Sequence, residues 1–365
     1  MSRFAGVSDV NPTKRDRAEG RQAKSRHHSS VVRPQQSRRW FIPLLAPLAF
    51  IFLSILPLSI PLAAEQDARW LLQNGRANQA LQVLNARIQK NPNDAQAYNL
   101  MARVYFQLEH WDDAIHAAEK SVALAPDVSE YHQWLARACG EKAEAAGAVS
   151  AFNLVRRVKS EFEKAVALDP DGKNVSARVD LAEFYIEAPY MMGGDKTKAR
   201  RLADSVMQRD PAVAHYILGK LEEKQNGKNH AEQEYRASIE TSGNLARYWV
   251  NLGSFYRHIG RLDDMESAVN KSLTAKQEDG VYLFDGASLL LNAGRNFPQA
   301  IQMLHRYLSL DDPAEDGPAF QAHYLLGSLL EKQGDTKAAA LEYRAALALA
   351  SEYKPAQDAL ARLSR

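Results

Sequence analysis

The eight residues Trp249–Tyr256, WVNLGSFY, decide the fold of this chain. In this stretch a leucine and a glycine stand between two aromatic residues, and Gly260 follows four positions later. The same order, exactly or in looser form, returns at three other places: His215–Gly219, His323–Gly327 and Tyr98–Tyr105. A separation of 34 residues between Leu218 and Leu252 gives the pattern a period. Self-similarity at such a period predicts a repeat architecture, in which each unit is one supersecondary element.

A second motif recurs along the chain and predicts a second helix in every unit. It consists of an alanine and, four residues later, an aromatic or aliphatic partner, as in Ala231–Tyr235, Ala339–Tyr343, Ala114–Ala118 and Ala300–Leu304. Prolines then close several units, at Pro92, Pro126, Pro170 and Pro211. Proline cannot continue a helix and therefore suits the turn into the next unit. The small residue after the leucine, such as Gly253, allows the two helices to approach closely.

These motifs resemble the tetratricopeptide repeat, whose signature is W-x₂-L-G-x₂-Y and whose period is 34 residues. The resemblance covers nearly everything after residue 64. It implies an all-α, right-handed superhelical solenoid of about eight helix-turn-helix units over residues 65–353, with a capping helix in 354–365. The expected units are 65–94, 95–128, 129–172, 173–211, 212–245, 246–279, 280–317 and 318–353.

Two of the expected units are longer than the period. Residues 126–170 contain the insertion EKAEAAGAVSAFNL, which lengthens either the helices or their connection. Residues 170–211 contain APYMMGGD, a stretch that invites comparison with a phosphate-binding loop. Such loops follow a strand and carry GxGxxG or GK[ST], and neither condition is met here. We interpret it as a long turn in which Asp195 caps the next helix.

The tip of this turn is a predicted contact point for a partner. Tyr190, Met191 and Met192 stand at its centre and are expected to protrude. An exposed apolar tip of this kind can serve as an interaction site.

The charge is divided between a basic tail and a weakly acidic body. Residues 1–39 hold ten Lys and Arg against three acidic residues, and the whole chain has a net charge of +2, so the remainder is acidic. A nucleic-acid-binding domain would itself be basic, which argues against nucleic acid as a partner. The tail lacks apolar periodicity, and we predict that residues 1–39 are disordered.

Residues 40–64 contain no charged side chain and are long enough to cross a bilayer as a helix. Their length favours an uncleaved anchor in a bacterial inner membrane, with the N-terminus cytoplasmic and the repeat body periplasmic. Four prolines and the small residues before Glu65 favour the alternative, a signal that is cleaved near Ala64 to release the body into the periplasm. The pair Arg38–Arg39 resembles a twin-arginine export signal.

No motif in the sequence predicts catalysis, a cofactor or a bound metal. Cys139 is the only cysteine, and its helical surroundings, ARACGEKA, predict a small buried residue. His110 and His116 lie six positions apart and do not share a helix face. There is neither HExxH nor GxSxG. We therefore predict a protein that is not an enzyme.

A stacked array of helix pairs presents its first helices on a concave face, which predicts a binding groove. The side chains expected there are Asn99, Arg103, Gln107, Gln133, Arg137, Val179, Glu183, Tyr216, Lys220, Ser254, Arg257, Phe284 and Tyr324. Aromatic residues and arginine are enriched at binding hot spots, so we expect a protein partner with acidic residues. Two alternatives remain: a glycan or small molecule held in the superhelix, and ordinary solvated helix faces.

Overall fold

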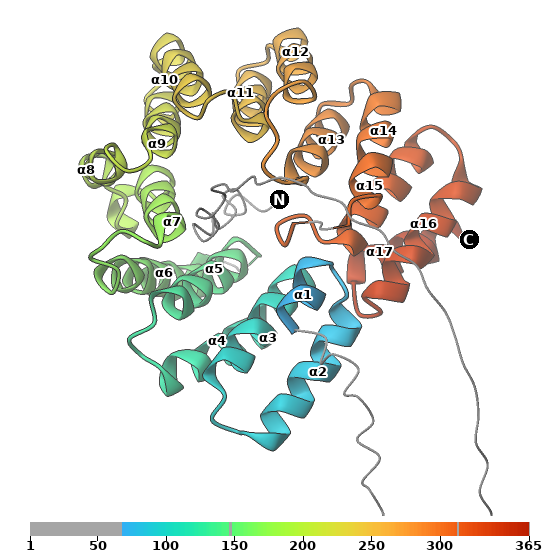
Figure 1. Cartoon of the computed structure of the whole chain (residues 1–365), viewed down its shortest axis with the longest axis horizontal. Coiled ribbons are helices and arrows are strands. Elements are labelled where there is room, and N and C mark those ends of the chain that lie inside the picture. Colours follow the sequence, from blue (N-terminus) through green and yellow to red (C-terminus); the bar gives the residue numbers. More distant parts are fainter. Residues whose placement is uncertain (1–67, 146–147, 312–313, 365) are drawn as a thin grey trace, which may run out of the picture. The chain divides into compact units, whose positions relative to one another are not determined.

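The computed structural model describes residues 68–145, 148–311 and 314–364, and within these ranges the regular secondary structure is helical apart from one isolated β-bridge between Leu245 and Lys276 (Figure 1). The described ranges contain seventeen α-helices and one short 3₁₀ turn, η1. The helices are α1 Ala68–Gln73, α2 Ala77–Lys90, α3 Ala95–Gln107, α4 Trp111–Leu124, α5 Ser129–Ala145, α6 Ala148–Ala167, α7 Val175–Glu187, α8 Lys196–Val206, α9 Pro211–Lys224, α10 Lys228–Thr241, α11 Ala246–His258, α12 Leu262–Ser272, α13 Val281–Ala293, α14 Phe297–Leu308, α15 Ala319–Lys332, α16 Thr336–Leu349 and α17 Lys354–Leu363. The turn η1 is Tyr190–Met192.

Each odd-numbered helix from α1 to α15 packs against the helix that follows it, and each pair contacts the next. Figure 1 shows the pairs following one another in chain order, with α17 packed on α16. The predicted all-α repeat solenoid is therefore confirmed for the described residues. One pair alone cannot bury its apolar face, so the core runs continuously from pair to pair.

Small residues set the distance between the two helices of a pair. At Gly327, a Cβ atom would lie 2.6 Å from the ring of Tyr343, which is fully buried on the partner helix. At Gly219, the corresponding distance to the ring of Tyr235 would be 3.1 Å. The aromatic ring on the second helix thus occupies the space that a larger residue on the first helix would need. This is the close approach that the sequence motif predicts.

The two long units depart from the regular period in different ways. In the third pair the helices themselves are long, since α5 has 17 residues and α6 has 20. In the fourth pair the excess lies between the helices, where η1 separates the end of α7 from the start of α8. Asp195 caps α8, and its carboxylate accepts hydrogen bonds from the amides of Thr197 and Lys198, each at 3.0 Å. The interpretation of this stretch as a turn and cap is confirmed.

The first and last pairs of the array contact each other, which the sequence analysis does not anticipate. Helix α2 packs against α16. The side chain of Asn78 donates to the carbonyl of Ala348 at 3.3 Å and accepts from the amide of Ser351 at 3.0 Å. The imidazole of His110 lies 3.3 Å from the carbonyl of Glu352. These contacts form a seam between residues near the two ends of the array.

The predicted basic tail, residues 1–39, and the predicted membrane segment, residues 40–64, lie outside the described residues. Within the described ranges, no helix is long and apolar enough to cross a membrane.

Candidate functional site

Three consecutive first helices, α3, α5 and α7, carry most of the buried polar side chains among the described residues. We call one set of them the inner polar row: Asn99, Arg103, Gln107, Gln133, Arg137, Ser176, Asp180 and Glu183. Within each helix these residues are three or four positions apart, so they share one face. On α9, the row continues with Tyr216 and Lys220.

Arg103 is the most heavily engaged residue of the row. Its Nε donates to Oε1 of Glu315 at 2.8 Å, and its terminal nitrogens pair with the second oxygen of Glu315 and with Glu130. The guanidinium carbon also lies 5.0 Å from the ring centroid of Trp134, a cation–π distance. A planar guanidinium that binds both oxygens of one carboxylate gives a strong and directional contact.

Arg137 forms a second buried centre with α7. Its Nε donates to Oδ2 of Asp180 at 2.6 Å, and one of its terminal nitrogens lies 3.0 Å from the hydroxyl of Ser176. Gln133 donates to the same Asp180 oxygen at 2.7 Å. The guanidinium carbon is 4.6 Å from the ring centroid of Trp134, so that ring contacts both arginines. These contacts tie the third pair to the fourth.

The row reaches α9 through Glu183. The hydroxyl of Tyr216 donates to Glu183 at 2.7 Å, and Nζ of Lys220 lies 3.6 Å from the same oxygen. Burial raises the pKa of the Glu183 carboxyl, while the neighbouring Lys220 and Tyr216 oppose that shift. The pKa of Tyr216 is raised as well, chiefly by burial and by the charge of Glu183.

Two atoms of the row have no hydrogen-bond partner among the described residues. They are Nδ2 of Asn99 and Oε1 of Gln107, both on α3 on either side of Arg103. Asn99 is only 2% exposed and Gln107 only 6%. A buried polar group without a partner costs about 1–3 kcal/mol, so native proteins keep few of them. A bound molecule that accepts a hydrogen bond from Asn99 and donates one to Gln107 would therefore remove the cost of leaving these two atoms unpaired.

The segment of residues 314–317, which we call the closing segment, brings Glu315 to α3. It belongs to the connection between α14 and α15. Tyr307 fixes it, because its hydroxyl accepts from the amide of Ala314 at 3.0 Å and contacts the carbonyl of Gly317 at 2.5 Å. Gln107 donates its Nε2 to the main-chain carbonyl of Glu315 at 2.9 Å. The closing segment therefore contacts the inner polar row through Glu315: its carboxylate binds Arg103, and its main-chain carbonyl accepts from Gln107.

Comparison with known families decides the architecture. One tetratricopeptide repeat model matches residues 99–157 and 284–354, and another matches residues 246–279. The model described as anaphase-promoting complex, cyclosome, subunit 3 matches residues 63–121. The chain contains tetratricopeptide repeats. In such arrays, extended concave surfaces are the usual binding surfaces, and the inner polar row lies on first helices.

The chain aligns with a curated protein, cytochrome c-type biogenesis protein CycH of Bradyrhizobium diazoefficiens, at 24% identity over 196 residues. That alignment covers 50% of the chain and 49% of CycH, so the chain spans about half of the length of this relative. Similar solved structures include the APC/C hetero-tetramer Cut9–Hcn1, at 14% identity and a TM-score of 0.44, covering 83% of this chain and 49% of that one. Yeast Tom70 matches at 11% identity and a TM-score of 0.43, covering 82% and 87%.

The predicted groove residues of the later tetratricopeptide repeats are partly buried: Ser254, Arg257, Phe284 and Tyr324. Phe284 packs on Tyr307 with ring centroids 5.9 Å apart, and Tyr324 packs on Tyr343 at 5.7 Å. Arg257 has a buried Nε with no hydrogen-bond partner among the described residues. The structure thus brings the predicted residues of α3, α5 and α9 into one row together with the predicted Glu183 of α7. All of these residues are buried except Lys220, which is partly buried. The four residues of the later repeats lie outside this row.

Sequence reasoning missed part of the inner polar row. On α7 it pointed to Val179 and Glu183, whereas Ser176 and Asp180 make the contacts with α5. The four-residue spacing of Ser176 and Asp180 is a signal that could have found them. Glu315 carries no such signal, because it lies in a connection between helices and meets α3 only through the tertiary fold.

The loop at η1 presents the predicted apolar tip. Tyr190 is 91% exposed and Met191 is 85% exposed, while Met192 is partly buried. The backbone beneath them is closely fitted, since a Cβ atom at Gly194 would lie 1.9 Å from the carbonyl oxygen of Ala188. The tip is therefore held outward by a defined turn.

A group of acidic side chains lies near the closing segment. Burial raises the pKa of Asp285 to about 8, and the negative charges of Asp316 and Asp279 add to that shift. Arg247 acts in the opposite direction. Sequence reasoning did not single out this group.

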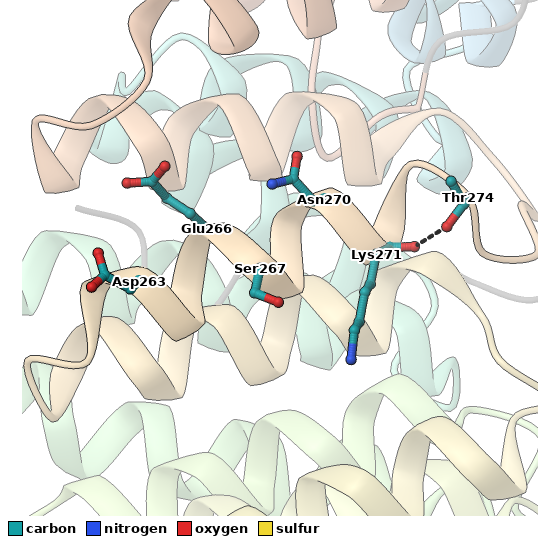
Figure 2. Close-up of a pocket in the computed structure, with 6 residues that line it drawn as sticks. All are labelled: Asp263, Glu266, Ser267, Asn270, Lys271 and Thr274. Atoms are coloured by element: carbon teal, nitrogen blue, oxygen red, sulfur yellow. Dashed lines mark hydrogen bonds between the residues drawn. The ribbon is translucent and has the colours of Figure 1, made fainter.

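A hollow of about 420 Å³ lies along α12, a helix that carries no residue of the inner polar row (Figure 2). It is lined by Asp263, Glu266, Ser267, Asn270, Lys271 and Thr274, which come from one helix and the turn after it. Arg295 pairs with Asp263 and Glu266, and Gln299 donates to Asn270 at 2.7 Å. Since most of its polar groups are engaged by neighbours, this hollow is a weak candidate for a binding site.

Cys139 is buried, as its surroundings predict, and burial raises the pKa of its thiol to about 11. A thiol with so high a pKa is almost entirely protonated near neutral pH and is a poor nucleophile. No group of three or more metal-binding side chains occurs in the ranges that the structure describes.

Proposed function

We propose that this chain is a non-enzymatic scaffold that binds an acidic segment of another protein against its first helices. The observation that carries the proposal is the inner polar row. It places arginines, and two amide atoms that have no hydrogen-bond partner among the described residues, on first helices, which line the concave side of such arrays. Arginine is suited to this role because its fork of donors matches a carboxylate.

The similarity to CycH suggests the class of partner that we propose. CycH is described as a cytochrome c-type biogenesis protein, and its alignment with this chain supports a partner within the assembly of c-type cytochromes. We propose further that the chain works in the cell envelope, with residues 40–64 as a membrane anchor and residues 65–353 as the exported body. The uncharged stretch 40–64 and the basic tail before it support that placement.

The proposal is tested by capturing partners with the full-length chain, immobilised in detergent, from a solubilised envelope fraction. A suitable variant is Lys220→Met, because this partly buried cation continues the inner polar row on α9 and lies 3.6 Å from Glu183. Lys224→Met is the matched control, since it removes the same charge one turn further along α9, where Lys224 is exposed and pairs with Glu187.

A stoichiometric protein partner that is lost in Lys220→Met and retained in Lys224→Met supports a protein-binding groove. If a glycan or small molecule co-purifies and no protein does, the chain is a ligand-binding repeat protein and the scaffold proposal falls. Equal capture by both variants would show that the partner does not bind along the inner polar row.

A further inference from the structure

We propose that Asn99, Arg103 and Gln107 form a binding site for one acidic residue of a partner polypeptide, and that Glu315 fills this site from within the chain. A partner would then bind by displacing the closing segment. This inference rests on the proposed function and adds to it the residue class that is recognised and a means of regulation.

The contacts of Glu315 are those of a bound peptide residue. Arg103 binds both carboxylate oxygens, and Gln107 donates to the main-chain carbonyl of the same residue at 2.9 Å. A site that contacts only a carboxylate would accept any anion. A site that also contacts the adjacent backbone carbonyl selects an acidic residue within a polypeptide.

The occupation by Glu315 leaves part of the site unused. Nδ2 of Asn99 and Oε1 of Gln107 are buried and have no hydrogen-bond partner among the described residues. An extended partner segment offers a donor and an acceptor at every residue, so it can pair with both atoms. Glu315 therefore satisfies the charge of Arg103 but not the hydrogen bonds on either side.

The probe for this site is a fluorescent synthetic peptide with the sequence of residues 309–319, SLDDPAEDGPA. A second peptide with Gln at the position of Glu315 tests whether the carboxylate is needed. Binding to the full-length chain is measured by fluorescence anisotropy for wild type, Glu315→Gln, and the double variant Arg103→Gln with Glu315→Gln. Asp311→Asn is the matched control, because this exposed residue lies on the same connection.

We expect Glu315→Gln to bind the acidic peptide at least about tenfold more tightly than wild type. The Gln peptide should show no such gain, and the double variant should lose the gain. Asp311→Asn should behave as wild type. If Glu315→Gln binds the acidic peptide no more tightly than wild type does, the proposal is wrong.

A second variant protects the test against misfolding. Should Glu315→Gln melt below the assay temperature, Tyr307→Phe serves instead, because it releases Ala314 and Gly317 and keeps both charged residues. It too should bind the acidic peptide more tightly than wild type, and unchanged binding overturns the proposal.

The two proposals can fail separately. If the envelope yields no protein partner while Glu315→Gln binds the peptide, the scaffold function falls and the acidic-residue site stands. If partners are captured and neither variant gains affinity, the scaffold stands and internal occupation by Glu315 falls.

Discussion

Arg103 and Glu315 are 212 positions apart in the sequence and form a two-point ion pair in the folded chain. The arginine stands on α3, in the second unit, and the carboxylate lies in the connection after α14, at the end of the seventh unit. In a linear repeat array each unit contacts its neighbours. This ion pair instead joins units that are five apart, and several predictions concern its energy and surroundings.

Loss of the arginine should destabilise the fold. In Arg103→Met the carboxylates of Glu130 and Glu315 lose their shared cation, and breaking a buried pair on one side costs about 3–5 kcal/mol. Because both carboxylates retain some exposure, we expect the lower end, about 3 kcal/mol, in urea unfolding. Lys354→Met, which breaks an exposed pair with Asp358, is the control and should cost under about 1 kcal/mol. Equal losses in the two variants would contradict a special role for Arg103.

Stability should depend on the ionisation of Asp285. Its pKa rises from 3.8 to about 8 on folding, so the folded chain binds more protons than the unfolded chain between these values. The free energy of unfolding must therefore fall as the pH rises from about 4 to about 8, and then level off. Asp285→Asn should remove this slope and stabilise the fold at pH 8 by on the order of 1–3 kcal/mol. Parallel pH profiles for wild type and Asp285→Asn would show that the group is not perturbed.

The turn that carries η1 should not tolerate a larger residue at its base. In Gly194→Ala the new methyl group would meet the carbonyl oxygen of Ala188, so the backbone must shift at a cost of about 1–3 kcal/mol. Gly243→Ala is the control, because the space around Gly243 is open and only its positive φ of 70° opposes alanine. That strain is about 1–2 kcal/mol. Thermal unfolding of both variants gives the comparison, and a smaller loss at Gly194 would mean that the turn relaxes easily.

The apolar tip should matter for binding but not for folding. Replacing Tyr190, Met191 and Met192 together by serine should change the free energy of unfolding by no more than about 0.5 kcal/mol, since two of the three are highly exposed. If the tip is a contact point, the triple variant should capture less of at least one envelope protein. Unchanged capture of every partner removes the tip from the interaction surface.

The helix pairs could be predicted from the sequence because their determinants are local. The small residue of WVNLGSFY-type stretches and the alanine of the second motif specify how two adjacent helices pack, and Gly327 against Tyr343 shows this directly. The cap at Asp195 is local as well, since its partners lie two and three residues away. In each case the interacting groups are within one repeat.

The surroundings of the predicted groove residues could not be predicted, because their partners come from other repeats. The period places Arg103 and Arg137 on inward faces, but it says nothing of Glu315 or of the hydrogen bond from Arg137 to Asp180. The prediction that these faces bind a partner remains a prediction.

The seam between α2 and α16 limits how this protein can evolve and unfold. An open array can gain or lose a unit at an end, because only one interface changes. Here the hydrogen bonds of Asn78 with Ala348 and Ser351 require the eighth pair to arrive beside the first. Removing or adding one unit would break these contacts and leave both ends unmatched. The same contacts join the two ends that would otherwise fray independently, and the array should therefore melt as one cooperative body.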